Sequence, residues 1–333
     1  MKHLEKTTMK AVVANGYGSP DILEVKEMPI PEIKSNEVLV KTSVASITRA
    51  DTLMRAGNPW YARLVLGLFK RKHPIMGTGY AGVIVVVGAQ RTDFEVGDCV
   101  FGETTTNFGT NAEYIAIGDE DIIMAMPDEI SFEEASTLCD GPVTSLNFLK
   151  LVGSVKPGME VLVIGASGSL GSAAVQLAKY LGATVTGVSS GKNKEFVKSL
   201  GADKVIDYQV TDFREQEAVY DVIYDTVGAY DFKTCKEALK PEGIYMSPVL
   251  SMPLLFASIF NKEGKKQAKF AATGLAPKDV IRQLLKELVS LKKGGKLEIS
   301  IEKRYSMDQI REAHTFVESG RKRGNVVLNI AEC

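Results

Sequence analysis

The spacing of apolar and polar residues follows two different patterns along this chain of 333 residues. Up to residue 127, short β-branched runs recur between Gly, Pro, Asn and Asp turns, which is typical of closely spaced β-strands. These runs are KAVVANG, EVLVKTSVASI, AGVIVVVGA, DCVFGET and AEYIAI. Residues 49–57 have the spacing of a short helix, whereas residues 58–74 are apolar and then basic and predict no single element. The pattern predicts a small, mostly β first domain, a barrel or a sandwich.

Strands and helices alternate after Pro127. Ser131 and Glu134 form a capping box that predicts the start of a helix. From Val161 the predicted order is strand, helix, strand, helix, strand, strand, helix, strand. The segments are VLVIG, the helix to Leu181, ATVTGV, NKEFVKSLG, KVIDY, YDVIYDTVG, FKTCKEALK and GIYMSPV. This order predicts a parallel sheet with helices on both faces, and therefore an α/β fold.

The alternation stops after Val249. An apolar run at residues 252–260 is followed by a predicted strand, KQAKFAATG, and by an amphipathic helix at 277–291. The remaining segments predict a strand (KLEISIEKRY), a helix at 306–319 and a final strand (GNVVLNI). Because this tail does not continue the alternation, we expect it to return to the first domain. The expected domains are therefore residues 1–127 with 272–333, and residues 128–271.

The strongest functional signal lies between Val161 and Leu181. Four consecutive apolar residues predict a strand buried on both faces, and a helical pattern follows a turn rich in glycine. Such a turn brings backbone N–H groups and a helix N-terminus close to a diphosphate. We therefore expect a dinucleotide to be bound by the turn residues Ala166, Ser167, Gly168, Ser169, Leu170 and Gly171.

The residues after the second strand of this domain indicate which nicotinamide cofactor binds. An acid directly after this strand would bind the ribose 2′-hydroxyl and favour NAD, but the first carboxylate that follows the strand is that of Glu195. Hydroxyls and lysines suit an additional phosphate, so NADP(H) is favoured, although the lysines also fit a solvated helix start. The candidate cofactor contacts are Ser189, Ser190, Lys192 and Lys194, together with Thr226 and Val227 at the end of YDVIYD.

Composition excludes several classes of function. The chain has 40 Lys and Arg against 41 Asp and Glu, so its net charge of −1 predicts no nucleic-acid partner. The four cysteines are scattered, with no ligand-pair spacing, which indicates a reducing compartment. The first residues lack the apolar core of a signal peptide, and residues 252–260 are too short to span a bilayer. We expect a cytoplasmic protein with no membrane partner.

The chain resembles the medium-chain dehydrogenase/reductase superfamily, and within it the zinc-free quinone oxidoreductase-like branch. The stretches that carry the resemblance cover nearly the whole chain; they include AGVIVVVG, VGDCVFG, GASGSLGSAAVQLAKYLGATVTGVSS, SLGADKVIDY and REAHTFVESGRKRGNVVLNI. It implies a GroES-like β-barrel catalytic domain, a doubly wound Rossmann domain, and an active site in the cleft between them. It also implies a homodimer through the edge strand KQAKFAATG. The cofactor contacts that it adds are Thr144, Tyr208 and Asn325.

The resemblance also bears on metal. Zinc-dependent relatives need Cys, His and acidic ligands, but this chain has only three histidines, His3, His73 and His314. Where those relatives carry Gly-His-Glu it has Gly-Thr-Gly at 77–79, and where they carry a zinc cysteine it has Ile-Thr-Arg at 47–49. We therefore expect no metal.

Without a Lewis acid, alcohol oxidation is difficult, whereas reduction of a polarised acceptor is easier. We expect an NADPH-dependent reductase that transfers hydride to a small electrophile, a quinone or an α,β-unsaturated carbonyl. Two alternatives stay open: a zinc-free enoyl-thioester reductase, with residues 70–72 as a basic entrance, and an NADPH-binding protein with little turnover. No catalytic acid–base pair is evident. The candidates for the substrate pocket are Thr48 (where zinc-free relatives often have asparagine), Asp51, Tyr61 and Tyr80, each of which also fits simple packing.

Overall fold

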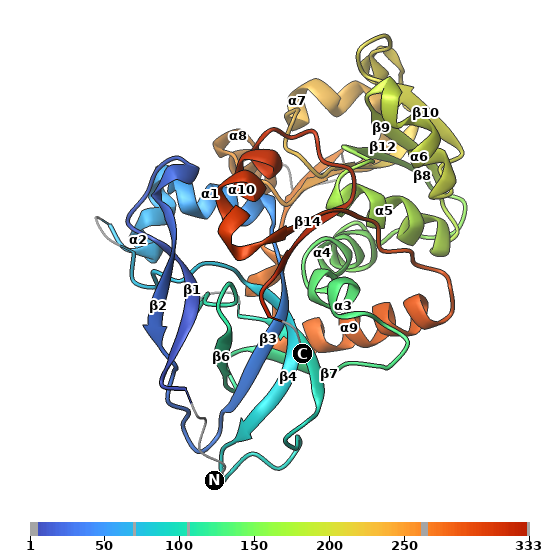
Figure 1. Cartoon of the computed structure of the whole chain (residues 1–333). Helices are drawn as coiled ribbons and strands as arrows, with labels where there is room; N and C mark the ends of the chain where they lie inside the picture. Colours follow the sequence, from blue (N-terminus) through green and yellow to red (C-terminus); the bar gives the residue numbers. More distant parts are fainter. Residues whose placement is uncertain (1–5, 69–70, 105–106, 261–265, 332–333) are drawn as a thin grey trace. The chain divides into compact units, whose positions relative to one another are not determined.

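The computed structural model describes residues 6–68, 71–104, 107–260 and 266–331, and it confirms the α/β class (Figure 1). The chain divides into two compact units. Unit 1 comprises residues 1–140 with 300–333, and unit 2 comprises residues 141–299. His3, Lys70 and Cys333 lie outside the described residues.

Unit 1 is built mainly from β-strands. A seven-stranded sheet has the order β14-β15-β3-β4-β5-β7, with β6 paired to β3, and β1 and β2 form a separate antiparallel pair. Two of these strands, β2 and β7, are not predicted by the apolar pattern. The bounds are β1 Thr8–Ala14, β2 Leu23–Pro29, β3 Val38–Ser46, β4 Gly79–Val87, β5 Cys99–Glu103, β6 Tyr114–Ile117, β7 Ile122–Ala125, β14 Ile301–Ser306 and β15 Asn325–Asn329.

The C-terminal segment completes this unit. Strand β15 pairs antiparallel with β3, with Val327 opposite Ser46, and it pairs in parallel with β14. One hydrophobic cluster of this unit is formed by buried residues from both ends of the chain, including Val12, Ile47 and Leu328. The helices of unit 1 are α1 Arg49–Ala56, α2 Arg63–Leu66, α3 Phe132–Leu138 and α10 Ile310–Glu318, with 3-10 turns η1 Pro20–Ile22, η2 Trp60–Ala62 and η8 Met307–Gln309.

Unit 2 is a parallel sheet of six strands with helices. The strand order is β10-β9-β8-β11-β12-β13, which is the doubly wound order 3-2-1-4-5-6. The strands are β8 Glu160–Ile164, β9 Thr184–Ser189, β10 Lys204–Asp207, β11 Tyr220–Asp225, β12 Leu239–Ser247 and β13 Gln267–Phe270. The helices are α4 Gly141–Asn147, η3 Phe148–Val152, α5 Ser169–Tyr180, η4 Gly191–Asn193, α6 Lys194–Ser199, η5 Phe213–Glu215, α7 Phe232–Cys235, η6 Lys236–Ala238, α8 Met252–Phe260, η7 Thr273–Leu275 and α9 Lys278–Lys293.

The bounds of the units differ from those of the expected domains at both crossings. Helix α9 packs against α4 in unit 2, where Lys150 Nζ lies 2.6 Å from Glu287 Oε2, whereas the expected boundary at residue 272 put this helix in the first domain. Helix α3 packs against β3 and β4 in unit 1, and Arg304 of β14 forms an ion pair with its Glu133. Local patterning predicts both helices, but it does not show which sheet each one covers.

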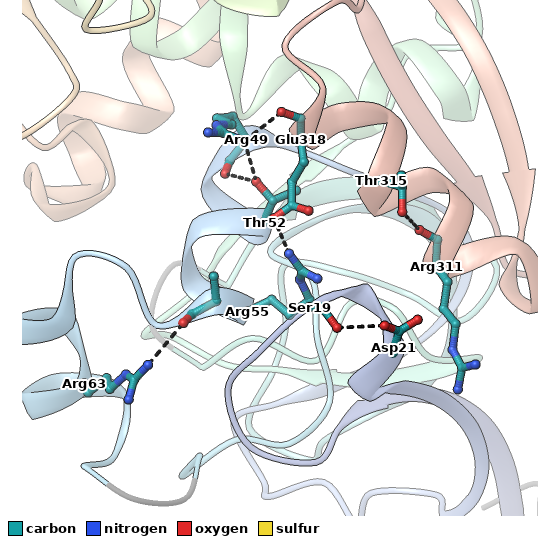
Figure 2. Close-up of polar contacts among 10 residues, drawn as sticks. Ser19, Asp21, Arg49, Thr52, Arg55, Arg63, Arg311, Thr315 and Glu318 are labelled. Carbon is teal, nitrogen blue, oxygen red and sulfur yellow. Dashed lines mark hydrogen bonds and ion pairs between the residues drawn. The ribbon is translucent and has the colours of Figure 1, made fainter.

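Helices α1 and α10 of unit 1 meet around a buried charge. The Arg55 side chain is completely buried, and its guanidinium forms a hydrogen-bonded ion pair with Glu318 (Figure 2). Arg49 donates a hydrogen bond of 3.3 Å to the Glu318 carbonyl oxygen, so the last residue of α10 is bound twice by α1. Burial lowers the pKa of Arg55, and the adjacent Glu318 opposes this change. The junction therefore depends on the Glu318 carboxylate.

We predict that Glu318→Ala lowers the free energy of unfolding of unit 1 by about 2 to 4 kcal/mol, because it leaves the buried Arg55 without its anionic partner. Glu312→Ala is the matched control, since Glu312 is an exposed glutamate of the same helix, and we expect a change of at most about 1 kcal/mol. Urea denaturation with hydrogen exchange of α1 and α10 measures both variants. Equal stabilities of the two variants would contradict the role given to this ion pair.

Candidate functional site

The glycine turn between β8 and α5 closes the carboxyl end of the central strand of unit 2. Gly165 adopts φ +75°, a conformation that favours glycine, and the N–H groups of Gly165 and Ala166 both donate to the Val188 carbonyl oxygen, at 3.1 and 3.0 Å. Gly168 is the N-cap of α5 and has no side chain with which to cap it. The first turn of α5 contains no acidic residue. The positive end of α5 is therefore left for an anion.

Among the three glycines of this turn, Gly171 packs most tightly against the backbone. A Cβ placed on Gly171 would lie 2.1 Å from the Gly165 carbonyl oxygen and 2.7 Å from the Ala166 Cα. Helix α4 approaches the same turn, because a Cβ on Gly141 would lie 2.4 Å from Ser169 Oγ, and Ser145 Oγ donates to the Leu170 carbonyl oxygen at 2.8 Å. A residue with a side chain would therefore clash at Gly141 or at Gly171. Thr144, on α4, is half-buried.

The carboxyl end of β11 meets this turn. Thr226 Oγ1 donates to the Ile164 carbonyl oxygen at 2.7 Å, and a Cβ on Gly165 would come within 2.7 Å of Val227. Asp225 holds the loop, because its carboxylate accepts N–H groups from Val227 and Gly228 at 3.1 and 2.8 Å. Burial raises the pKa of Asp225, although these donors favour the carboxylate. Val227 is 54% exposed at the sheet end, whereas Thr226 is mostly buried.

The loop after β9 is linked to the glycine turn. Asn193 Nδ2 donates to Ser167 Oγ at 2.9 Å. Ser189 is buried and its hydroxyl donates to the Ser190 carbonyl oxygen at 3.3 Å, whereas Ser190 is half-buried. The remaining candidates of this loop region, Lys192, Lys194 and Tyr208, are exposed.

These residues fit a dinucleotide. The turn supplies a cradle that any added Cβ at Gly171 would fill, and the start of α5 supplies an uncapped, acid-free helix N-terminus. The ends of β8, β9, β10 and β11 bring together the candidates from the sequence analysis on one edge of the sheet. Thr144 and Asn325 had been suggested only by resemblance, and Asn325 belongs to unit 1, where its side-chain amide donates to the Ser300 carbonyl oxygen at 3.2 Å.

Thr48 and Asp51 form a buried helix cap in unit 1. Thr48 is the N-cap of α1 and its hydroxyl accepts the Asp51 N–H at 3.0 Å, while the Asp51 carboxylate accepts the Thr48 N–H at 2.8 Å. Burial raises the pKa of Asp51 to about 6, and the hydrogen bonds from Thr48 oppose this change. Both side chains hold the start of α1, which is the packing alternative that the sequence analysis had kept open.

The two tyrosine candidates lie in different surroundings. Tyr80 is completely buried in the barrel core, and its hydroxyl donates to the Ile122 carbonyl oxygen at 3.3 Å, so it offers no hydroxyl to a substrate in this structure. Tyr61, in η2, is half-buried and packs edge to face against Trp60, with ring centroids 6.1 Å apart. Tyr61 therefore remains a proposed contact.

Arg71, one of the residues suggested as a basic entrance for an acyl carrier, is buried. It donates hydrogen bonds to the Met54 and His73 carbonyl oxygens at 2.9 and 3.3 Å. Its guanidinium also lies over the rings of Tyr17 and Phe108. Arg71 thus holds the segment after α2 in place within unit 1.

The donor set for a metal is poor. Within the described ranges, no three His, Cys, Asp or Glu side chains form a group that could hold an ion. His314 is completely buried, and burial, reinforced by Arg55, lowers its pKa to about 3. The histidine therefore stays neutral near pH 7.

Three residues around the cradle were missed by the sequence analysis. Asn193 and Asp225 organise the loops around the glycine turn, and Asp207 lies at the end of β10 beside Gly191. Asp225 ends a predicted strand just before Thr226, so its position was a usable signal. The contacts of Asn193 and Asp207 depend on tertiary structure and have no local signature.

The comparisons with known proteins agree with this geometry. The family model described as "Alcohol dehydrogenase GroES-like domain" matches residues 34–128, and the one described as "Zinc-binding dehydrogenase" matches residues 200–328. The chain is 31% identical to "2-methylene-furan-3-one reductase" of Solanum lycopersicum, over 96% of this chain and 79% of the relative. It is 34% identical to the chloroplastic "NADPH-dependent alkenal/one oxidoreductase" of Arabidopsis thaliana, over 70% of this chain and 61% of the relative.

A solved structure shows the same fold. The quinone oxidoreductase from Coxiella burnetii is 27% identical, with a TM-score of 0.87, and the match covers 97% of this chain and 100% of that one. Unit 1 is therefore GroES-like and unit 2 is Rossmann-like, as the resemblance implied. None of the helices in the described part of the chain has the length and apolarity required to cross a bilayer.

We predict that Gly171→Ala destabilises unit 2 by about 1 to 3 kcal/mol, because the new methyl group would overlap the Gly165 carbonyl oxygen. Gly168→Ala is the matched control, since its Cβ would lie 3.5 Å from the same oxygen, an ordinary contact. Thermal denaturation without cofactor separates the two variants. Equal melting temperatures for both variants would contradict the packing argument. If Gly168→Ala keeps its stability but loses NADPH affinity, the added methyl group hinders the close approach of the diphosphate.

Proposed function

Because this chain belongs to the zinc-free, quinone oxidoreductase-like branch of the medium-chain dehydrogenase/reductase superfamily, we propose that it is an NADPH-dependent reductase of quinones or α,β-unsaturated carbonyls. The observation that carries the proposal is the Gly165–Gly171 turn. Its backbone approach and its uncapped, acid-free helix start are suited to a dinucleotide diphosphate. The names of the relatives, a methylene-furanone reductase and an alkenal/one oxidoreductase, support an electrophilic acceptor.

The bound cofactor would supply the hydride. The residues of this chain would bind and orient it: the turn N–H groups toward the diphosphate, and the β11 loop, held by Asp225, along the sheet end. Where zinc-dependent relatives carry ligands, this chain has Thr48 and the Gly-Thr-Gly of residues 77–79, so no Lewis acid is assigned to the reaction. Of the pocket candidates, Tyr61 is retained as a substrate contact.

NADP(H) is preferred to NAD(H) in this proposal. Ser190 and the exposed Lys192 lie in the loop that follows β9, where the additional 2′-phosphate of NADPH would bind. A hydroxyl and an ammonium group are suitable donors for a phosphate. The name of the Arabidopsis relative, which includes NADPH, supports the same choice.

We also propose a cytoplasmic homodimer. Strand β13 is one of the two outer strands of the described sheet of unit 2, and an unpaired strand edge can bind a second copy. Beside it, helix α8 exposes apolar side chains that a partner would cover: Met252, Phe256, Ile259 and Phe260. The thiols of Cys139 and Cys235 are free and buried, which suits a reducing compartment. Light scattering that gives the mass of one chain would contradict the dimer.

We expect the purified protein to oxidise NADPH, followed at 340 nm, in the presence of a quinone or an enone, and to do so equally in the presence of a chelator. A crotonyl thioester and NADH serve as comparison substrates. Preferential turnover of the thioester would favour an enoyl-thioester reductase instead. Tight NADPH binding without turnover of any acceptor, or activity that requires stoichiometric zinc, would contradict the proposed function.

We expect Lys192→Glu to weaken NADPH binding by about tenfold or more and to leave NADH binding nearly unchanged, because the substitution puts a negative charge where the 2′-phosphate binds. Lys198→Glu is the matched control, since Lys198 is an exposed lysine of the neighbouring helix α6. Fluorescence titration with both nucleotides measures the affinities. If Lys192→Glu weakens both nucleotides equally, Lys192 does not belong to the phosphate site.

A further inference from the structure

A carboxylate lies at the end of the sheet where the proposal places the 2′-phosphate. Asp207 is the last residue of β10 and pairs with Ser189, the last residue of β9. The next residue, Tyr208, donates its N–H to the Ser189 carbonyl oxygen at 3.3 Å. Gly191 is in direct contact with the carboxylate, because a Cβ there would lie 2.4 Å from Asp207 Oδ2. Asp207 is thus beside the loop that carries Lys192.

The contacts of Asp207 require an oxygen acceptor and not a negative charge. Its Oδ1 accepts the Gln209 N–H at 3.0 Å, and its carbonyl oxygen accepts the N–H groups of Val210 and Thr211 at 3.0 and 2.9 Å. These bonds shape the turn after β10. No ion pair to the Asp207 carboxylate is present within the described ranges, so its charge is not neutralised by a lysine or arginine there.

A phosphate and a carboxylate repel each other, whereas a carboxylate accepts hydrogen bonds from ribose hydroxyls. We infer that Asp207 is a specificity-determining residue that narrows the preference of this protein for NADPH over NADH. The inference rests on the proposed function, because it assumes that the nicotinamide cofactor binds along the ends of β8, β9 and β10. It differs from the assignment of Ser190 and Lys192, which favour the phosphate; Asp207 opposes it. No acid directly follows β9 in the sequence, but the fold supplies one from the next strand.

Asp207→Asn tests the inference, because asparagine keeps an oxygen that can accept the Gln209 N–H and removes the charge. We expect the Kd of NADPH to fall by about five- to tenfold, the effect of removing one like charge from a partly hydrated site, while the Kd of NADH changes less than twofold. Added salt screens the repulsion, so the gain should shrink as the salt concentration rises. Glu195→Gln is the matched control: Glu195 is an exposed acid of α6 near the same loop, and its loss should change neither Kd.

Fluorescence titration of the full chain with each nucleotide measures these constants, and Asp207→Ser, which also offers an acceptor oxygen, replaces the asparagine variant if that one does not fold. Unchanged NADPH affinity in Asp207→Asn, or an equal gain for NADH, would overturn the inference. The failure of the proposed function looks different. In that case the wild-type protein would bind neither nucleotide, or it would bind NADPH without turnover of any acceptor, whatever Asp207 does.

Discussion

The contact on which this structure depends most is the approach of α5 to the turn after β8. The Gly171 backbone passes so close to the Gly165 carbonyl oxygen that an added Cβ would lie 2.1 Å away. Because of this approach, α5 begins just after the end of the central strand. The helix has no capping side chain and no acid in its first turn. The N-terminal N–H groups and the helix dipole are thus directed to a site that suits an anion. The same packing that stabilises unit 2 therefore creates the candidate diphosphate site.

The parallel sheet then determines which other residues can take part. With the order β10-β9-β8-β11, the loops after the second, third and fourth strands all lie at the same edge as the glycine turn. Asn193 connects the β9 loop to Ser167, and Asp225 holds the β11 loop. We propose that two opposite charges at this end of the sheet set the cofactor affinity: Lys192 attracts the additional phosphate and Asp207 repels it.

Much of this could be predicted from the sequence, because the signals are local. Three glycines at fixed spacing between an apolar run and a helical pattern identify the cradle, and strand–helix alternation predicts the parallel sheet. Local patterning does not show long-range packing. The pattern around Tyr80 does not show that its hydroxyl is used inside the barrel, and that around Asp51 does not show that its carboxylate caps α1. Helix α9 is amphipathic in either unit, and Asp207 approaches Gly191 only because β10 lies beside β9.

The proposed reaction is direct hydride transfer from NADPH to an electrophilic carbon, with no metal. The most direct measurement is the reduction of an α,β-unsaturated ketone with NADPH dideuterated at C4 of the nicotinamide, in the presence of a chelator, with the product examined by mass spectrometry and NMR. We expect one deuterium at the β-carbon of every product molecule. A product without that deuterium, or no product until zinc is added, would contradict it.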